Sequence, residues 1–348
     1  MKSTRLNTGG QTRGELCIMS CASGIPLTRR IMDHLNKIIR QDNPGVDLEM
    51  VRSEEITFAN GEIKTIIKDN IRGADLYIVQ AIDDPQSPKS INDNLLALLT
   101  AINAAYQSDA DSITVITPQF PYSRQERKKT REGISAKQIA AFMELSGADR
   151  VITLDIHAEA IQGFFNRAKL EDLHASNTII SYFRKHFPVD NLVVASADVG
   201  GAEKARYYSQ RLQTDMAIVD KSRDYSKSSV IESMRLVGNV NGKDVLIPDD
   251  MIGTGGTIVN AAKLLKRHHA RDIYVASSLP FFNPPALDIL QEAYEKGEIK
   301  CVMGTDAVFW GEEFIKKTRW YVEVSVAALF AQVIYNINTK RSVSTLLK

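Results

Sequence analysis

Apolar and polar positions along this chain recur in one unit: a short apolar run, a polar loop, and a segment with apolar residues at helical spacing. The run ADLYIVQ leads to NDNLLALLTAINAAY, SITVITPQ to SAKQIAAFMEL, NLVVAS to GAEKARYYSQRL, and DVLIP to TIVNAAKLLKRHH. Short apolar runs are typical of buried strands, and the longer periodic segments are typical of amphipathic helices. Strands that alternate with helices predict an α/β fold with mainly parallel sheets flanked by helices.

The loop after residues 244–247 is the strongest candidate site, because ligands of such folds bind at the carboxyl ends of strands. It reads PDDMIGTGGTI, residues 248–258. The backbone N–H groups of a glycine-rich helix start suit a phosphate, and two hydroxyls lie beside them. Asp249 and Asp250 would repel phosphate, but carboxylates accept hydrogen bonds from the vicinal hydroxyls of a sugar. The loop therefore predicts a phosphorylated sugar, although acids that end a strand before a plain glycine turn are the alternative reading. The phosphate cradle consists of Thr254, Gly255, Gly256 and Thr257.

A cationic stretch, FPYSRQERKKTREGIS, covers residues 120–135 and also follows an apolar run. Most charge runs form solvated surfaces, and that reading stays open here. A loop after a strand can instead fold over the ligand as a lid, and its arginines could clamp a polyphosphate through bidentate contacts. The spacing of Ser135 and Gln138 predicts a capping box at the start of the next helix.

Two further acid-bearing segments follow apolar runs. In VITLDIHAEA, Asp155 and His157 would point the same way by strand alternation, and His157 could bind a metal or a phosphate or be a packing residue. In ASADVGGAEK, Asp198 precedes two glycines at a helix start, which predicts a second anion site with one carboxylate for Mg²⁺.

Two shorter segments carry weaker signals. In IVDKSR, Lys221 and Arg223 lie two residues apart on one side of an extended segment, where they could meet a transferring phosphoryl group or be solvated. In FANGEIKTII, Phe58, Asn60 and Glu62 surround a hairpin-like turn. The aromatic ring and polar groups of this turn could hold a purine.

Composition narrows the classes of protein further. The 348 residues suffice for two domains, and the balance of 43 basic and 42 acidic residues argues against binding to nucleic acid or a membrane surface. Three scattered cysteines favour a reducing cytoplasm over a disulfide framework. The polar residues 1–14 read as a disordered tail, and no apolar run reaches the length of a membrane span.

The glycine-rich loop resembles the PRPP-binding loop of the phosphoribosyltransferase superfamily. Together with PYSRQERK, REGISAK, GADRVITLDIHAEAIQGFF, VGGAEKAR and DKSR, it makes the chain similar to class I ribose-phosphate diphosphokinases from about residue 15 to the carboxyl end. The resemblance implies two tandem phosphoribosyltransferase-like domains. The first would cover 15–172 with the returning segment 325–348, and the second would cover 173–324.

The resemblance also implies the reaction, in which ATP and ribose 5-phosphate give PRPP and AMP with Mg²⁺, for nucleotide biosynthesis. It implies a dimer-based homo-oligomer, commonly a hexamer. Motif by motif, it assigns the metal to His157 and Asp198, and the ribose hydroxyls to Asp249 and Asp250. The 5-phosphate would bind at 254–257. ATP would be bound by Arg124, Gln125 and His157, and also by three residues of a neighbouring subunit: Phe58, Asn60 and Glu62. Catalysis would depend on Lys221, Arg223 and Arg124.

Gly253 departs from the family pattern, which usually has an aspartate at this position of the loop. The glycine removes a carboxylate beside the sugar phosphate and adds backbone freedom, which costs about 0.5–1 kcal/mol to order. Two alternatives therefore stay open: a non-catalytic, nucleotide-binding partner subunit of an active enzyme, and a phosphoribosyltransferase that uses PRPP with a base. The segment ASSLPFFNPPALDI, residues 276–289, also departs from the family, so regulation by phosphate or ADP is not implied.

Overall fold

The computed structural model describes residues 12–223, 231–344 and 346, while the side chains of 221–223 and 231–233 lie outside that description. The chain divides into two compact units. Unit 1 contains the residues up to His174 together with Asp306–Phe309 and the segment from Ser325 onward, and unit 2 contains Ala175–Thr305 and Trp310–Val324. Most of the expected tail, residues 1–11, lies outside the described residues.

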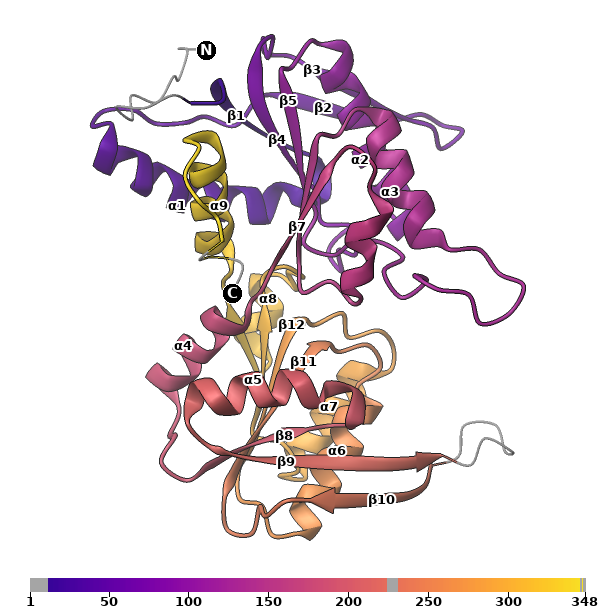
Figure 1. Ribbon diagram of the computed structural model, residues 1–348, viewed down its shortest axis with the longest axis vertical. Helices are drawn as coiled ribbons and strands as arrows, with labels where there is room; N and C mark the ends of the chain where they lie inside the picture. The colour runs from indigo at the N-terminus through magenta and orange to yellow at the C-terminus, as the bar shows by residue number, and fades with distance from the viewer. Residues whose placement is uncertain (1–11, 224–230, 345, 347–348) are drawn as a thin grey trace. The chain divides into compact units, whose positions relative to one another are not determined.

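The core of unit 1 is a five-stranded sheet in the order β1-β4-β5-β6-β7, in which all neighbouring strands are parallel (Figure 1). β4 and β5 are buried along their whole length, as expected for parallel strands that are covered on both faces. The strands are β1 Glu15–Ser20, β4 Ala74–Val79, β5 Ser112–Ile116, β6 Arg150–Leu154 and β7 Lys169–Leu173.

Helices cover both faces of this sheet, because successive side chains of a strand point to opposite sides. On β4, Leu76 and Ile78 pack in one apolar cluster with residues of α2 and α3, whereas the Tyr77 hydroxyl lies 3.5 Å from the Ile334 carbonyl of α9. Helix α2 begins at a capping box formed by Ser90 and Asp93. The helices of unit 1 are α1 Ile25–Asp42, α2 Ile91–Gln107, α3 Ser135–Ser146, α9 Ala327–Asn338, and the 3-10 turns η1 Ala22–Gly24 and η2 Glu159–Phe164.

The carboxyl-terminal helix α9 lies beside α1 in unit 1, as Figure 1 shows. The Asn338 amide donates to the buried Asp75 carboxylate at 3.0 Å. Arg13 joins the same group, since its backbone N–H donates to the Asn338 carbonyl at 2.8 Å and its guanidinium lies 3.6 Å from Asp75. Ordered structure thus begins before residue 15, because Arg13 contributes a charge to a buried carboxylate.

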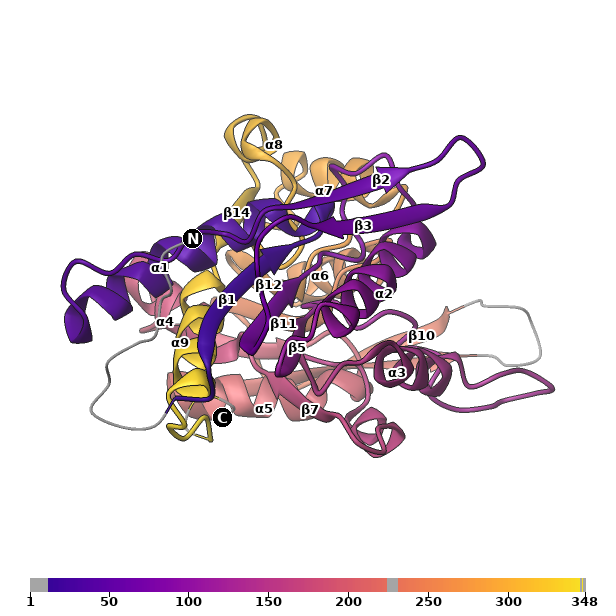
Figure 2. The ribbon, with the colours of Figure 1, turned by 90° about the horizontal axis from the view of Figure 1, so that it is seen from above.

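A separate two-stranded hairpin extends from unit 1 (Figure 2). β2 Ser53–Thr57 and β3 Ile63–Ile67 pair antiparallel with Thr57 opposite Ile63. The tip closes with a hydrogen bond from the Phe58 N–H to the Glu62 carbonyl at 2.8 Å, and Gly61 has a φ of 89°, which is favourable for glycine. This confirms the turn expected at Asn60 and Gly61.

Unit 2 is built on a seven-stranded sheet in the order β10-β9-β8-β11-β12-β13-β14, parallel except for β10. The glycine-rich loop follows β11, the middle strand. The strands are β8 Leu192–Ser196, β9 Asp215–Arg223, β10 Ile231–Val237, β11 Asp244–Met251, β12 Ile273–Leu279, β13 Cys301–Thr305 and β14 Tyr321–Val324. The helices are α4 Ser176–His186, α5 Ala202–Leu212, α6 Gly256–Arg267, α7 Ala286–Glu295, α8 Glu312–Lys317 and the 3-10 turn η3 Val199–Gly201.

The α/β fold class expected from the alternation is confirmed in both units. Among the helices that the structure describes, none is long and apolar enough to cross a lipid bilayer.

Candidate functional site

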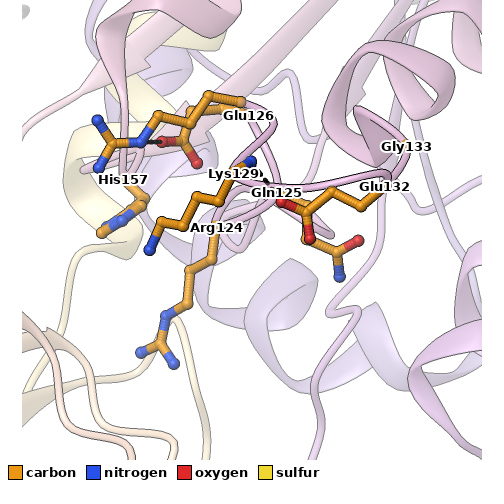
Figure 3. A pocket seen from close by; sticks show the side chains of 8 residues that line it. Arg124, Gln125, Glu126, Lys129, Glu132, Gly133 and His157 are labelled. Atoms are coloured by element: carbon orange, nitrogen blue, oxygen red, sulfur yellow. Dashed lines mark hydrogen bonds and ion pairs between the residues drawn. The ribbon is translucent and has the colours of Figure 1, made fainter. Parts of the chain in front are cut away.

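Part of the expected nucleotide site of unit 1 lies around one cavity of about 290 Å³ at the carboxyl ends of β5 and β6 (Figure 3). Three of its lining residues, Arg124, Gln125 and His157, were expected there. The other five are Glu126, Arg127, Lys129, Glu132 and Gly133. The cationic stretch thus lines a cavity beside His157, and it brings two carboxylates with it that the sequence reading left without a role.

Side-chain and backbone hydrogen bonds fix the start of this loop. The Gln125 N–H donates to the Tyr122 carbonyl at 2.9 Å, and Tyr122 has a left-handed backbone with a φ of 60°. The Ser135 hydroxyl donates to Gln125 Oε1 at 2.6 Å. The expected capping box is therefore wrong: Ser135 is the first residue of α3 and Ile134 is its N-cap, without a side-chain cap, because the hydroxyl bonds across the loop instead.

The electrostatics of the cavity keep His157 neutral. Burial lowers the pKa of its imidazole; Glu126 opposes this, while the charges of Arg124 and Arg127 lower the pKa further. A neutral imidazole has one ring nitrogen with a lone pair. His157 is thus suited to bind a metal ion or to accept a hydrogen bond.

Asp155 does not point with His157, so the expectation from strand alternation is wrong. β6 ends at Leu154, and Asp155 adopts a left-handed φ of 45°, which breaks the two-residue period. Its carboxylate is buried and lies 3.1 Å from His174 Nδ1. The pair anchors the turn that leads to His157, since Asp155 N–H also donates to the Leu173 carbonyl at 2.7 Å.

Glu144 of α3 holds the segment that follows His157. Its Oε1 accepts the backbone N–H groups of Asn166, Arg167 and Ala168 at 2.8, 2.6 and 2.8 Å. Burial opposes ionisation of this carboxyl, but those N–H groups outweigh burial and lower its pKa. Glu144 therefore ties α3, directly after the cationic loop, to the end of the η2 turn.

In unit 2 the glycine-rich loop joins β11 to α6 as expected. β11 runs through Asp249 and Asp250 to Met251, so both carboxylates end the strand. Gly255 is the N-cap of α6 with a φ of 77°, which favours glycine, and a Cβ at Gly256 would meet open space. Within the described chain, the α6 start has no side-chain cap and no acid in its first turn. Its N–H groups suit an anion.

The other glycine-rich start, at α5, is built differently. Asp198 Oδ1 accepts the Gly201 N–H at 3.1 Å and caps the turn itself, so the carboxylate occupies the place expected for an anion. Lys204 in the first turn of α5 forms an ion pair with Asp250. The sequence analysis did not predict a role for Lys204. Its position in the helix directly after Asp198 and the two glycines was a signal that could have suggested one.

The remaining expected site residues lie apart from these groups. Phe58 at the hairpin tip is 47% exposed, and the Glu62 N–H donates to Asn60 Oδ1 at 3.1 Å. Lys221 and Arg223 lie near the end of β9, which confirms the extended segment, and their side chains lie outside the described residues.

The described residues include groups of the types that bind divalent cations. No group of three His, Cys, Asp or Glu side chains in the described part of the chain is arranged for a metal. Mg²⁺ commonly binds one or two protein groups and completes its shell with substrate phosphates and water. The imidazole of His157 in unit 1 and the carboxylate of Asp198 in unit 2 are each of a type that can take part in such binding.

These features define the class of protein. Each unit is a mainly parallel sheet covered by helices, and unit 2 carries an acid-bearing, glycine-rich loop after its middle strand, which is the arrangement of a phosphoribosyltransferase-type domain. Family models match over both: the N-terminal domain of ribose phosphate pyrophosphokinase over residues 16–147, and the phosphoribosyl transferase domain over residues 168–313.

Full-length relatives agree with the two models. A ribose-phosphate pyrophosphokinase of Chlorobaculum tepidum is 40% identical over 83% of this chain and 85% of the relative, and ribose-phosphate pyrophosphokinase 1 of Listeria monocytogenes is 38% identical over 87% and 91%. The crystal structure of phosphoribosylpyrophosphate synthetase from Mycobacterium smegmatis superposes with a TM-score of 0.80 at 29% identity, covering 92% of this chain and 98% of that one. The chain belongs to the ribose-phosphate pyrophosphokinase family.

Proposed function

We propose that the protein transfers the diphosphoryl group of ATP to the C1 hydroxyl of ribose 5-phosphate, giving PRPP and AMP. The observation that carries this function is family membership over both units, together with an intact phosphate loop after β11. PRPP formed in this way supplies nucleotide biosynthesis.

The sugar phosphate binds in unit 2. The N–H groups and hydroxyls of residues 254–257 hold the 5-phosphate at the positive end of α6. Asp249 and Asp250 accept hydrogen bonds from the ribose hydroxyls, and this orients the C1 hydroxyl. Lys204 forms an ion pair with Asp250, and this contact positions that carboxylate beside the sugar.

The nucleotide binds through unit 1. Arg124 and Gln125 lie in the loop that lines the cavity, and the Arg124 guanidinium suits bidentate contacts to phosphate oxygens. The projecting tip of the hairpin carries Phe58, Asn60 and Glu62. In a dimer-based homo-oligomer such as a hexamer, this tip contacts the nucleotide of a neighbouring subunit. The exposed Phe58 ring offers a stacking surface for the base.

Transfer requires alignment and neutralisation of phosphoryl charge. The oxygen of the C1 hydroxyl forms a bond to the β-phosphorus and releases its proton to solvent. The bond from that phosphorus to the α,β-bridging oxygen breaks, so that AMP leaves with the bridging oxygen. Lys221, Arg223 and Arg124 stabilise the charge that develops. His157 and Asp198 are the residues that would hold Mg²⁺, which would supply Lewis-acid neutralisation of the phosphates when bound.

The test is ³¹P NMR of the purified protein with Mg²⁺, ATP and ribose 5-phosphate. Resonances of AMP and of a diphosphate on the sugar C1 are expected. Intact nucleotide binding without turnover would favour a regulatory partner subunit, to which Gly253 points, and base-dependent consumption of PRPP would favour a phosphoribosyltransferase. The balanced charge and the buried, unpaired cysteines support a cytoplasmic location for the enzyme.

A further inference from the structure

The cavity of unit 1 contains a carboxylate that its cationic surroundings do not explain. Glu126 lines the cavity with Arg124, Arg127, Lys129 and His157, and its side chain is 15% exposed. Its Oε2 is buried and has no hydrogen-bond partner within the described residues. A buried acceptor without a partner is costly, so this oxygen is suited to a partner that arrives with the ligand.

The neighbouring cations do not supply that partner. Arg127 Nε lies 3.5 Å from Glu126 Oε1, beyond a good hydrogen bond, and the Arg127 side chain is 74% exposed. The contact leaves Oε2 without a donor. In Figure 3 the Glu126 carboxylate and the His157 ring lie on the same side of the loop, and the two groups interact electrostatically.

A second carboxylate in the same cavity shows what a satisfied acid looks like there. Glu132 Oε1 accepts the backbone N–H groups of Lys129 and Thr130, and these bonds lower its pKa. Glu132 thus serves the fold of the loop. Glu126 Oε2 accepts no hydrogen bond from any residue that the structure describes, so the two acids of one cavity differ in role.

A triphosphate beside Glu126 would be repelled by its carboxylate unless a cation lies between them. Carboxylate oxygens are preferred ligands of Mg²⁺, which often joins one or two protein groups to substrate phosphates. We propose that Glu126 is a carboxylate ligand of the divalent cation that accompanies the nucleotide, on the side of the cavity where His157 lies. This assignment rests on the proposed function, because it takes the cavity to be the nucleotide site.

The experiment measures metal binding without turnover. The full-length protein is saturated with α,β-methylene-ATP, in which the bond to be broken is replaced, and is titrated with Mn²⁺ while free Mn²⁺ is followed by electron paramagnetic resonance. Glu126→Gln keeps the shape and removes the charge, and it should raise the Kd for Mn²⁺ on the order of 10-fold or more. Glu132→Gln, the matched control in the same loop, should stay close to wild type.

Three outcomes would overturn the proposal. The first is wild-type Mn²⁺ affinity in Glu126→Gln, and the second is an equal loss of Mn²⁺ affinity in Glu126→Gln and Glu132→Gln, which would indicate only the net charge of the loop. The third is an equal loss of Mn²⁺ affinity in Glu126→Asp and Glu126→Gln with unchanged thermal melting. Glu126→Asp keeps the charge and should bind Mn²⁺ better than Glu126→Gln.

The wild-type ³¹P assay separates this proposal from the function it rests on. PRPP formation by the wild type with unaltered Mn²⁺ affinity in Glu126→Gln would sink the ligand assignment alone. Absence of PRPP, with Mn²⁺ binding that depends on Glu126, would sink the synthetase and leave the metal ligand.

Discussion

The cavity of unit 1 and the phosphate loop of unit 2 are both proposed to bind phosphate, but they are built in opposite ways. In unit 2 the backbone forms the proposed phosphate site. β11 carries two acids near its end, Gly255 turns the chain at a φ of 77°, and α6 begins at the next residue. In unit 1 a loop brings cations and acids together, and side-chain bonds such as Ser135 to Gln125 hold it.

The difference follows from what each site must do. A helix start offers fixed N–H groups that need no rearrangement to hold the small phosphate of a sugar. A loop of long, charged side chains can close over a larger, metal-bound nucleotide and open again to release AMP. The loop of unit 2 is therefore proposed to be a fixed phosphate site, and the charged loop of unit 1 is proposed to be a lid over its own cavity. The following predictions test that contrast.

The largest effect is expected at the charges proposed to act during transfer. Lys221→Ala or Arg223→Ala should lower kcat on the order of 100-fold or more, as loss of one preorganised donor does. Steady-state kinetics would measure this, with Lys243→Ala as the control, because the Lys243 ammonium pairs with Asp215 at the other end of β9. Wild-type turnover in both variants would remove these residues from the mechanism.

The anchor of the unit 1 site should matter for stability. Glu144→Gln weakens the acceptor for three backbone N–H groups and should lower the free energy of unfolding by about 1–3 kcal/mol, measured by urea titration. Because the folded state lowers the pKa of Glu144, its contribution is present above the ordinary glutamate pKa and is lost as the pH falls below it. An equal difference between wild type and variant at pH 7 and at acidic pH would contradict this assignment.

If the two substrates bind at separate sites, a variant of one site should raise the KM of one substrate and leave the other KM nearly unchanged. Arg124→Ala should raise the KM for ATP about 10-fold through loss of a charge-assisted hydrogen bond, with little change for ribose 5-phosphate. Asp249→Asn should do the reverse. Arg131→Ala is the control in the cationic loop, since Arg131 does not line the cavity. A variant that raised both values equally would break the comparison between the two sites.

The smallest effect is expected at the departure from the family loop. Gly253→Asp should lower the KM for ribose 5-phosphate a few-fold, because it restores a carboxylate beside the sugar and reduces backbone freedom by about 0.5–1 kcal/mol. The ATP value serves as the internal control. An unchanged or raised KM for the sugar would show that the glycine is suited to this loop.

Local patterns in the sequence predicted the α/β class, the hairpin turn at Asn60 and Gly61, and the position of the glycine-rich loop. These features depend on local physics: apolar periodicity defines strands and helices, and a glycine at positive φ beside a helix start is readable from the order of residues. The sequence also predicted that the two acids before Gly255 bind a sugar, and this stays a prediction.

The side-chain contacts of the site could not be predicted in this way. Ser135 was expected to cap its own helix, yet it bonds to Gln125. Asp155 was expected beside His157, yet a left-handed turn buries it against His174. In the sequence, Glu126 was one acid within a cationic stretch. In the structure, its Oε2 is buried and has no hydrogen-bond partner among the described residues, and this distinguishes it. Such pairings depend on contacts between residues distant in sequence and on burial, and no local pattern of residues encodes either of them.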